Sequence, residues 1–332
     1  MSKRMRLGAR AALAFVVTVC AASGAFAAEK KKKPLPRGTP VLWREREVER
    51  LDVLAGPGGR GMRPNLRRLR VLKEETGGFS PKYRVRDASG RVWVAKLGSE
   101  AQSETAATRL VWAAGYMTEI NYLAPCVRLP GVGKVKKEVG RCAGGGFANV
   151  RFEARPAGVR RLDEWRWKEN PFRGRLQFQG LKVLMALLNN WDMKDENNVI
   201  LHAPGRGRGE LRYAISDLGA TLGKSGGLPL FWRITRSRNK PEDYAEAKFI
   251  DKVRSDGRVD FNFTGKNKGL LDDVTVAEAR WVGRLLARLS DEQLADAFRA
   301  ANYTPEEVRT LASAVRSRVE ELVNLPGSES RR

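Results

Sequence analysis

Between Leu69 and Leu97 three short apolar runs alternate with turn residues, and this pattern limits the possible folds more than any other feature of the chain. The runs are LRVLKEE, KYRVRDASG and RVWVAKL, with TGGFSP and DASG as the turn segments. β-Branched and apolar residues between clusters of glycine, proline, serine and aspartate are typical of short strands joined by turns. The segment therefore predicts a three-stranded antiparallel meander.

A helix is expected directly after the meander, over the segment SEAQSETAATRLVWAAG. Ser99 is a plausible N-cap because Gln102 follows three residues later, and Gly115 closes the far end. Two more strands are expected, around residues 126–129 and 148–153, before a turn at ARPAGV. The first half of the chain thus has five predicted strands, with one helix after the third.

The second half of the chain is expected to be mainly helical. After an apolar helix, LQFQGLKVLMALLNN, come two short strands, NNVIL and LRYAIS, on either side of a glycine-rich loop. Asp291 and Thr304 lie near helix starts in the last three helical runs, which are VTVAEARWVGRLLARL, DEQLADAFRAA and TPEEVRTLASAVRSRVEEL. Residues 222–269 are rich in glycine, lysine and arginine with weak periodicity, so we expect a long irregular segment there.

This order of elements predicts an α+β fold of two lobes. A small antiparallel β-sheet lobe with one helix precedes a mainly helical C-terminal lobe. The expected boundaries are a signal peptide over 1–27, a basic Gly/Pro-rich arm over 28–68, an N-lobe over 69–155 and a C-lobe over 156–332. The arm lacks a periodic apolar face, so we expect the lobes to fold without it, with Trp43 and Leu51 as the evidence against this.

The N-terminus has the features of a secretory signal peptide. Four basic residues precede an apolar run over about residues 11–20, and Ala25 and Ala27 fit the A-x-A pattern before a cleavage point. The run is short for a membrane span, although an uncleaved anchor is the alternative. Cys20 lacks the small residue expected before a lipoprotein cysteine. We expect an exported protein, periplasmic or secreted, with no integral membrane domain.

The chain is strongly basic. It has 62 Lys and Arg against 38 Asp and Glu, a formal charge of +24 that falls to +20 without the four basic residues of the signal peptide. Such a charge attracts polyanions at low salt. However, the basic residues are spread along the chain and interleaved with acids, as in WREREVER, and no nucleic-acid motif with interleaved aromatics is present.

Few cysteines and a single histidine limit the chemistry further. In an oxidising compartment Cys126 and Cys142 can pair, and we expect a disulfide between them. With His202 as the only histidine, a His-rich zinc site is excluded, and a Ser-His-Asp triad would have to use this residue. The segment ILHAPGRGRG is typical of a strand that runs into a turn, so we interpret His202 as an ordinary turn residue.

The third predicted strand and the helix after it carry a candidate ion pair. Lys96 lies in VWVAKLG, and Glu104 lies on the following helix, where it can face the strand. A carboxylate in that position can hold the lysine toward a phosphate group, whereas the alternative is an ordinary edge-strand lysine. Glu100 is a competing partner, but an acid at a helix start often only complements the helix dipole.

The turn TGGFSPK between the first two strands is a candidate phosphate-binding loop. Gly77 and Gly78 allow a phosphate group to approach the backbone closely, and Ser80 and Lys82 add a hydroxyl group and a positive charge. The alternative is a plain hairpin turn.

The segment NNWDMKDENN links the long apolar helix to the next strand. Four residues separate Asp192 from Asn197, and Lys194 and Glu196 are among them. Twenty residues after Asn197, Asp217 ends a predicted strand and is followed by leucine and glycine. Each pattern is weak evidence alone. The functional interpretation is strengthened by their order: a lysine on a strand, a glutamate on a helix, an aspartate and an asparagine in a loop, and an aspartate after a strand pair.

In this order the residues resemble those of the protein-kinase-like superfamily in its atypical form. D-x-x-x-x-N has the spacing of the kinase catalytic loop, and D-L-G resembles the D-F-G element. The resemblance covers roughly residues 69–325 and is nearest in character to HipA-type serine kinases, phosphatidylinositol kinases and secretory-pathway kinases. The motifs VAKLG-x-EAQ-x-E, NNWD-x-K and DLG also resemble a group of uncharacterised exported bacterial proteins.

The resemblance implies ATP and Mg²⁺ as cofactors. Lys96 would contact the α/β-phosphates and pair with Glu104, while the loop Gly77, Gly78, Ser80 and Lys82 would bind phosphate. Asp192 would accept the proton of the substrate hydroxyl, with Lys194 as a further candidate catalytic residue. Asn197 and Asp217 would hold magnesium.

The chain also departs from the kinase pattern. Asn190 and Trp191 stand where His-Arg would precede the catalytic aspartate, and neither G-x-G-x-x-G nor A-P-E is present. The hairpin between Asn197 and Asp217 is longer than usual. These differences place the chain away from eukaryotic protein kinases and leave the acceptor open.

The expected function is therefore that of an exported kinase-like phosphotransferase that moves a phosphoryl group from Mg-ATP to an unidentified hydroxyl acceptor. A protein, a lipid headgroup or a small molecule is compatible as the acceptor, and so is nucleotidyl rather than phosphoryl transfer. The alternatives are a catalytically inactive kinase-fold protein that binds a nucleotide or a partner, and a basic secreted polyanion-binding protein. Phosphoryl transfer needs mainly charge neutralisation and in-line positioning, which suits a chain with one histidine.

Overall fold

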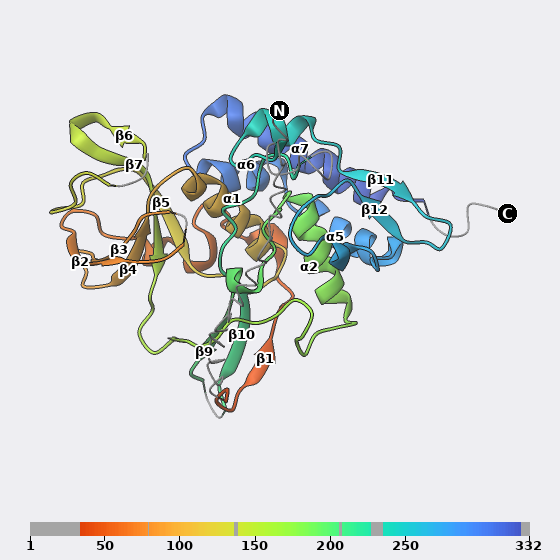
Figure 1. Cartoon of the computed structure of the whole chain (residues 1–332), viewed down its shortest axis with the longest axis horizontal. Coiled ribbons are helices and arrows are strands. Elements are labelled where there is room, and N and C mark those ends of the chain that lie inside the picture. Colours follow the sequence, from red (N-terminus) through yellow and green to blue (C-terminus); the bar gives the residue numbers. More distant parts are fainter. Residues whose placement is uncertain (1–33, 79, 136–138, 206–207, 227–234, 327–332) are drawn as a thin grey trace, which may run out of the picture. The chain divides into compact units, whose positions relative to one another are not determined.

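The computed structural model describes residues 34–78, 80–135, 139–205, 208–226 and 235–326. The predicted signal peptide lies outside these residues. Figure 1 labels the helices and strands. Six short 3₁₀ helices supplement them: η1 (Val48–Arg50), η2 (Gly56–Gly58), η3 (Arg60–Met62), η4 (Ala143–Gly145), η5 (Asp195–Asn197) and η6 (Lys268–Leu271).

The largest sheet contains the predicted meander. Its strands are β2 (Arg70–Glu75), β3 (Lys82–Arg86), β4 (Val92–Lys96), β5 (Asn121–Val127), β6 (Arg141–Cys142) and β7 (Gly146–Ala154). The order is β2-β3-β4-β7-β5, β6 pairs with β7, and every pair is antiparallel. The three-stranded meander and the strand around 148–153 are confirmed, whereas the strand expected around 126–129 begins earlier, at Asn121, and ends at Val127.

Successive side chains of β4 and β7 point to opposite faces of the sheet. Trp93 and Ala95 of β4 lie with Val150 and Phe152 of β7 in one apolar core cluster. Successive strand residues point to opposite faces, so Lys96 lies on the other face of the sheet. Its register partner on β7 is Arg151, which presents a second basic side chain to that same face.

Helix α1 (Glu100–Ala113) follows β4 as predicted and is buried on nearly every face. It packs against β5 and β7 and also contacts α6 (Asp291–Arg299). Ser99 occupies the N-cap position without a capping side-chain hydrogen bond among the described residues. Gly115 follows the helix with a φ of +94°, and an added Cβ would lie 2.4 Å from the backbone oxygen of Arg44, so only glycine fits there.

The disulfide between Cys126 and Cys142 is present, which confirms the predicted pairing. It joins the end of β5 to β6, and both of these strands pair with β7. The bridge therefore closes the end of the sheet that carries the glycine-rich connection.

A second sheet has the order β1-β10-β9-β8. Strands β9 (Asn198–Ala203) and β10 (Glu210–Ile215) form the predicted hairpin, while β8 (Arg160–Arg161) and β1 (Thr39–Val41) flank it. Because paired antiparallel strands bring the residues before one strand beside those after the other, the segment before β9 meets the segment after β10. That meeting point carries the candidate metal-binding residues.

The remaining helices form the second half of the chain. They are α2 (Leu176–Leu187), α4 (Pro241–Glu246), α5 (Val276–Ala287), α6 and α7 (Pro305–Val323). Thr275, Ser290 and Thr304 each form a reciprocal capping box at the start of the last three helices. The helical half is confirmed, and with the antiparallel sheets it establishes the predicted α+β class.

One buried arginine ties three helices together. Arg318 of α7 donates hydrogen bonds to the backbone oxygens of Leu187, at 2.6 Å, and of Tyr244, at 2.9 Å. Its guanidinium also lies 4.0 Å from the centre of the Tyr244 ring. The end of α2 and the α4 segment are thus fixed to α7 by a charged group whose donors are used inside the protein.

The expectation of a wholly irregular segment over residues 222–269 is wrong for its described part. That part contains α4, β11 (Ile250–Val253) and β12 (Val259–Phe261), and it buries Tyr244 and Phe249. Each element is only three to six residues long. Elements this short contain too few repeats for a helical or strand period to appear in the sequence.

Residues 39–62 do not extend away from the rest of the chain. Leu42, Val48 and Val53 are buried in the larger core cluster, and Trp43 donates a hydrogen bond to the Ala114 backbone oxygen at 2.8 Å. Gln293 of α6 donates to the Val48 oxygen at 2.8 Å. The apolar residues insert one at a time along an irregular path, so they show no period, and we now expect this segment to stabilise the fold.

In the part of the chain that the structure describes, no helix is both long and apolar enough to span a bilayer. The division at residue 155 between an N-lobe and a C-lobe stays a prediction. Two separate apolar clusters fit it: one lies within residues 69–154, and the other draws mainly on the helical half.

Candidate functional site

Lys96 stands at the centre of the candidate site. Its ammonium lies 2.8 Å from Glu104 Oε2, 3.0 Å from Glu100 Oε2 and 3.5 Å from Asp217 Oδ1. Lys96 is 3% exposed and Glu104 is 1% exposed. The structure thus places the predicted strand lysine against the predicted helix glutamate, and it adds two further carboxylates.

Glu100 contacts Lys96 together with Glu104 rather than in its place. The two glutamates are one helical turn apart, so both side chains reach the same side of α1. Ser80 is buried as well and donates a hydrogen bond to Glu100 Oε2 at 2.7 Å. The interpretation of Glu100 as a mere complement to the helix dipole missed this contact.

Arg151 and Glu153 extend this cluster of ion pairs, and neither residue was predicted from the sequence. Arg151 donates hydrogen bonds to Glu104 Oε1 and, at 2.8 Å, to Glu153 Oε2. Both residues alternate with the apolar residues of β7, and that alternation is the sequence signal for one polar face on this strand. Glu104 therefore accepts from two cations, Lys96 and Arg151, which fixes the orientation of its carboxylate.

Burial and charge act in opposite directions on these groups. Burial alone would lower the pKa of Lys96, but the carboxylates of Glu104, Asp217 and Glu100 raise that pKa above its ordinary value. Lys96 is therefore a permanent cation at neutral pH, as a phosphate-binding lysine must be.

The loop between β2 and β3 lies next to this cluster. Gly77 and Gly78 have φ values of +108° and +74°, so both adopt conformations that favour glycine. A Cβ added to Gly78 would lie 3.1 Å from Lys82 Nζ, and the charge of Lys82 in turn acts on Asp217. Ser80 and Lys82 are thus brought to the site, whereas Gly77 and Gly78 are in the turn that leads to it.

The structure of the segment after α2 explains why two asparagines follow an apolar helix. Asn189 takes a left-handed conformation with a φ of +51°, and its side chain donates to the Gly223 oxygen at 2.7 Å. The Asn190 amide donates to the Met185 oxygen at 2.9 Å. The pair ends the helix and turns the chain into the loop that carries Asp192.

Asp192 is held by two neighbours in the same loop. Lys194 Nζ lies 3.0 Å from its carboxylate, and Asn197 Nδ2 donates to the Asp192 backbone oxygen at 2.6 Å and to its Oδ2 at 3.3 Å. The three predicted loop residues therefore lie together. Trp191 anchors the loop from the other side by donating to the Ser237 oxygen at 2.8 Å.

Asn197 joins this loop to Asp217. The amides of Ser216 and Asp217 both donate to the Asn197 backbone oxygen, at 2.9 and 3.1 Å. Asp217 Oδ1 accepts from the Gly219 amide at 3.1 Å as well as from Lys96. A Cβ on Gly219 would lie 2.8 Å from Glu100 Cβ, so the glycine of the D-L-G element lets this loop approach α1 closely.

The oxygens that remain suit a magnesium ion. Among the described residues no hydrogen-bond donor is recorded for Asn197 Oδ1 or for Asp217 Oδ2, although both side chains are engaged through their other atom. Magnesium takes oxygen ligands and is usually held by one or two carboxylates plus substrate phosphates. The described residues contain no cluster of three or more His, Cys, Asp or Glu that could form an all-protein metal cage.

The charge state of Asp217 fits that role. Burial would raise the pKa of Asp217, but the Lys96 ammonium outweighs it, with help from the Gly219 amide, Arg151 and Lys82, so the pKa lies below its ordinary value. A carboxylate that stays ionised at neutral pH can hold a cation without first losing a proton.

Comparison with known proteins gives little beyond a general similarity. No family model matches the chain, and no curated protein matches it. A proinflammatory kinase from Helicobacter pylori, CtkA, is 10% identical, covers 78% of this chain and 92% of its own, and has a TM-score of 0.43. The Rio2 kinase of Chaetomium thermophilum, solved as an ADP/Mg²⁺-phosphoaspartate complex, is 12% identical, covers 76% and 72%, and has a TM-score of 0.32. Both scores lie below 0.5, so the functional assignment depends on the contacts described above.

Proposed function

We propose that the chain is an exported, kinase-like phosphotransferase that moves the γ-phosphoryl group of Mg-ATP to a hydroxyl acceptor. One observation carries this proposal most directly: Lys96, held by Glu104, contacts Asp217, and the backbone of Asp217 is bonded to Asn197. Four separate segments thus supply a cation, its partner and two candidate oxygen ligands within one connected network. Phosphoryl transfer needs this set of groups and little covalent chemistry from the protein.

Lys96 would neutralise the α/β-phosphates. A lysine can turn toward a ligand only if it is presented on a rigid support, and here β4 supplies the backbone while Glu104 and Glu100 restrict the side chain. The 3.5 Å contact with Asp217 is the longest of its three ion pairs. We expect a bound phosphate to replace that contact first.

Asn197 and Asp217 would hold magnesium through Oδ1 and Oδ2 respectively, the two oxygens that accept no hydrogen bond from the described residues. The ion would neutralise negative charge on the phosphates of the nucleotide. Ser80, Lys82 and the two glycines of their turn would approach the phosphates from the β2–β3 side.

Asp192 would act on the acceptor. Its carboxylate takes the proton of the acceptor hydroxyl while the acceptor oxygen forms a bond to the γ-phosphorus. The bond between that phosphorus and the bridging oxygen breaks, and its electron pair leaves with ADP. Lys194, 3.0 Å from Asp192, can neutralise charge on the transferred group.

The main alternative is a chain of the same fold that binds a nucleotide without transfer. The pairing of Asp192 with Lys194 and Asn197 motivates this alternative, because these contacts compete with an acceptor hydroxyl for the carboxylate. Export remains part of the proposal on the strength of the N-terminal pattern alone.

Direct measurement on the purified mature chain separates these functions. Thermal stabilisation by ATP that depends on magnesium supports a nucleotide site, and release of ADP on addition of a hydroxyl acceptor supports transfer. Stabilisation without turnover by any acceptor class would favour the inactive form. If ATP with magnesium produces no stabilisation, the proposed site is wrong.

A further inference from the structure

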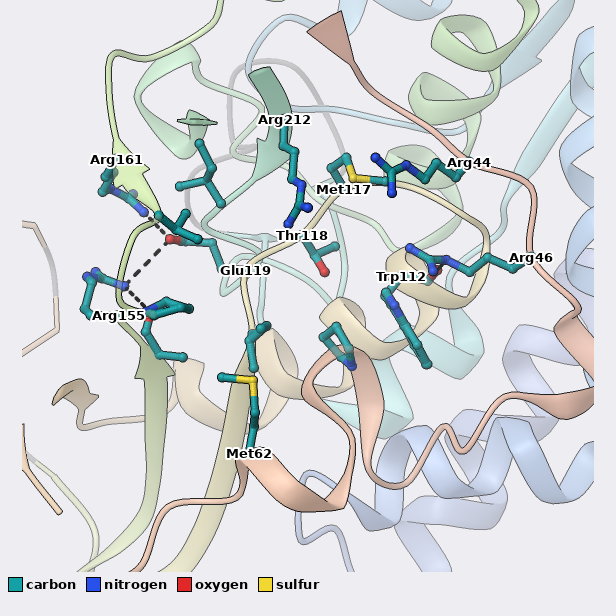
Figure 2. Close-up of a pocket in the computed structure, with 16 residues that line it drawn as sticks. Arg44, Arg46, Met62, Trp112, Met117, Thr118, Glu119, Arg155, Arg161 and Arg212 are labelled. Carbon is teal, nitrogen blue, oxygen red and sulfur yellow. Dashed lines mark hydrogen bonds and ion pairs between the residues drawn. The ribbon is translucent and has the colours of Figure 1, made fainter. Parts of the chain in front are cut away.

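A cavity separate from the candidate site lies between the start of β5, the end of β7, β9, β10 and the N-terminal segment (Figure 2). Its volume is about 380 Å³, within the range of roughly 300–1,000 Å³ that is usual for small-molecule sites. None of the residues assigned to nucleotide, magnesium or acceptor lines it. The cavity therefore needs its own explanation.

Five arginines line the cavity: Arg44, Arg46, Arg155, Arg161 and Arg212. Figure 2 shows the first two and the last on one side and the other two on the opposite side, beside Glu119. Most of the remaining lining is apolar, including Met62, Met117 and Leu201. The cavity thus combines a cationic wall with an apolar interior.

The two groups of arginines differ in how they are compensated. Arg155 and Arg161 pair with Glu119 and Glu153. Arg44 and Arg212 share a single carboxylate, that of Glu210. Two carboxylates serve the first group, one of them shared with Arg151, whereas Arg44 and Arg212 have one between them, so the second wall has the larger excess of positive charge.

Arg46 adds to this excess. Among the described residues it has no recorded ion pair: its Nε donates to the Trp112 oxygen at 3.0 Å, and its guanidinium lies 5.2 Å from the centre of the Trp112 ring. Burial, together with the neighbouring charge of Arg44, lowers its pKa. A half-buried guanidinium next to another cation is favourable only when an anion compensates it.

Thr118 supplies a second, independent sign of a missing partner. Its hydroxyl oxygen is shielded from solvent and has no recorded hydrogen-bond partner among the described residues. Figure 2 shows the residue between Arg212 and Arg46, with its side chain in the cavity. Leaving this hydroxyl without a partner costs free energy, and because it is shielded in this rotamer, it would donate to a ligand acceptor after turning toward the cavity.

We propose that this cavity binds a small organic anion that carries a carboxylate or phosphate group on an apolar body. Arg44, Arg46, Arg212 and Thr118 contact the anionic group, and the methionines and Leu201 contact the apolar part. An inorganic anion would satisfy the arginines but leave the apolar lining empty, and a neutral apolar molecule would leave the arginines uncompensated. This proposal does not depend on the phosphotransferase function.

The test is calorimetric titration of the full mature chain with hexyl phosphate and hexanoate, in the absence of nucleotide. We expect at least one of them to bind at least tenfold more tightly than both inorganic phosphate and hexanol. Arg46→Met should weaken that binding about 10- to 100-fold, and Thr118→Val about two- to tenfold, which are the effects of losing a charged and a neutral hydrogen bond. Thr118→Val keeps the β-branched shape and removes only the unpartnered hydroxyl, so the variant should fold normally.

Arg258→Met is the matched control, because Arg258 is an exposed arginine paired with Asp256 outside the cavity. It should leave the affinity unchanged. The proposal is wrong if neither amphipathic anion binds, if inorganic phosphate binds equally well, or if the Arg258 and Arg46 variants lose affinity to the same extent. Which of the two probes binds more tightly identifies the anionic group.

Discussion

The backbone oxygen of Asn197 accepts a hydrogen bond from the amide of Asp217 at 3.1 Å, which couples the loop after α2 to the loop after β10. Asp217 follows Asn197 by twenty positions in sequence, and the β9–β10 hairpin returns the chain to the same point. The two proposed magnesium ligands therefore lie in two loops whose spacing is set by backbone hydrogen bonds. The predictions below depend on this network and on its neighbours.

Lys96→Met should destabilise the protein substantially and abolish nucleotide binding. Loss of the ammonium leaves Glu100 and Glu104 buried with less compensation, and breaking a buried ion pair typically costs about 3–5 kcal/mol. Urea unfolding followed by circular dichroism measures the change. Lys73→Met is the control: its exposed ammonium lies 3.6 Å from Glu75, which also pairs with Arg84, and the expected change is within about 0.5 kcal/mol. Equal effects of the two substitutions would contradict the assignment of Lys96.

Gly219→Ala should separate the Asp217 loop from α1. The new methyl group would lie 2.8 Å from Glu100 Cβ, closer than packed carbons allow, and overpacking of this kind costs about 1–3 kcal/mol. ATP affinity in the presence of magnesium should fall, as measured by titration calorimetry. Gly269→Ala, whose nearest side-chain atom is Asp272 Oδ2 at 3.5 Å, is the tolerated control. Unchanged ATP affinity in Gly219→Ala would show that the close approach is unimportant.

Leu42→Ala should lower the free energy of unfolding by about 2–5 kcal/mol, because Leu42 is buried in the larger core cluster. Leu35→Ala, at an exposed position, should have little effect. Chemical denaturation of both variants measures the difference. A small loss for Leu42→Ala would restore the original expectation that this segment is dispensable.

The pattern of turns and alternation was sufficient to predict most of the fold. The meander, α1, the helical half and the disulfide each depend on local chemistry that a short window of sequence contains. The path of residues 39–62 could not be predicted, because Leu42, Val48 and Val53 are buried in a core cluster whose other members lie far away in the chain, among them residues of α1, α2 and α6. Local periodicity contains no information of that kind.

The candidate site was predictable in part for the same reason. Lys96, Glu104, Asp192 and Asp217 could be identified from their order along the sequence. The contributions of Glu100 and Arg151 could not, because they depend on side chains that meet between the sheet and the helix. The five-arginine cavity has no sequence signal at all. Its residues lie between Arg44 and Arg212, and in a chain so rich in arginine no single one is distinctive.

Anion binding in the cavity should strengthen as the pH falls from 8 to 6. Burial and the neighbouring Glu153 raise the pKa of Glu119 to about 7, against the opposing effect of Arg161 and Arg155. Below that pH Glu119 is neutral, so the cavity becomes more positive and hexanoate, which stays ionised, should bind about two- to tenfold more tightly.

Glu119→Gln should remove this pH dependence and keep the higher affinity throughout. His202→Gln is measured in parallel as a control on the neighbouring strand, where the His202 ring lies 3.4 Å from the Arg160 guanidinium. Calorimetric titration at pH 6, 7 and 8 gives the comparison. An affinity that rises with pH, or a dependence that survives in Glu119→Gln, would contradict the role of Glu119.

Asp217 and Asp192 should have different functions, and this difference tests the central claim most directly. The measurement is magnesium-dependent binding of ATP, by thermal shift and calorimetry, in the parent chain, in Asp217→Ala and in Asp192→Asn. We expect Asp217→Ala to abolish the binding. Asp192→Asn should bind ATP almost normally but transfer phosphoryl groups about 10²- to 10⁴-fold more slowly, the usual contribution of a positioned general base. Binding in the parent that persists unchanged in Asp217→Ala would contradict the proposed site.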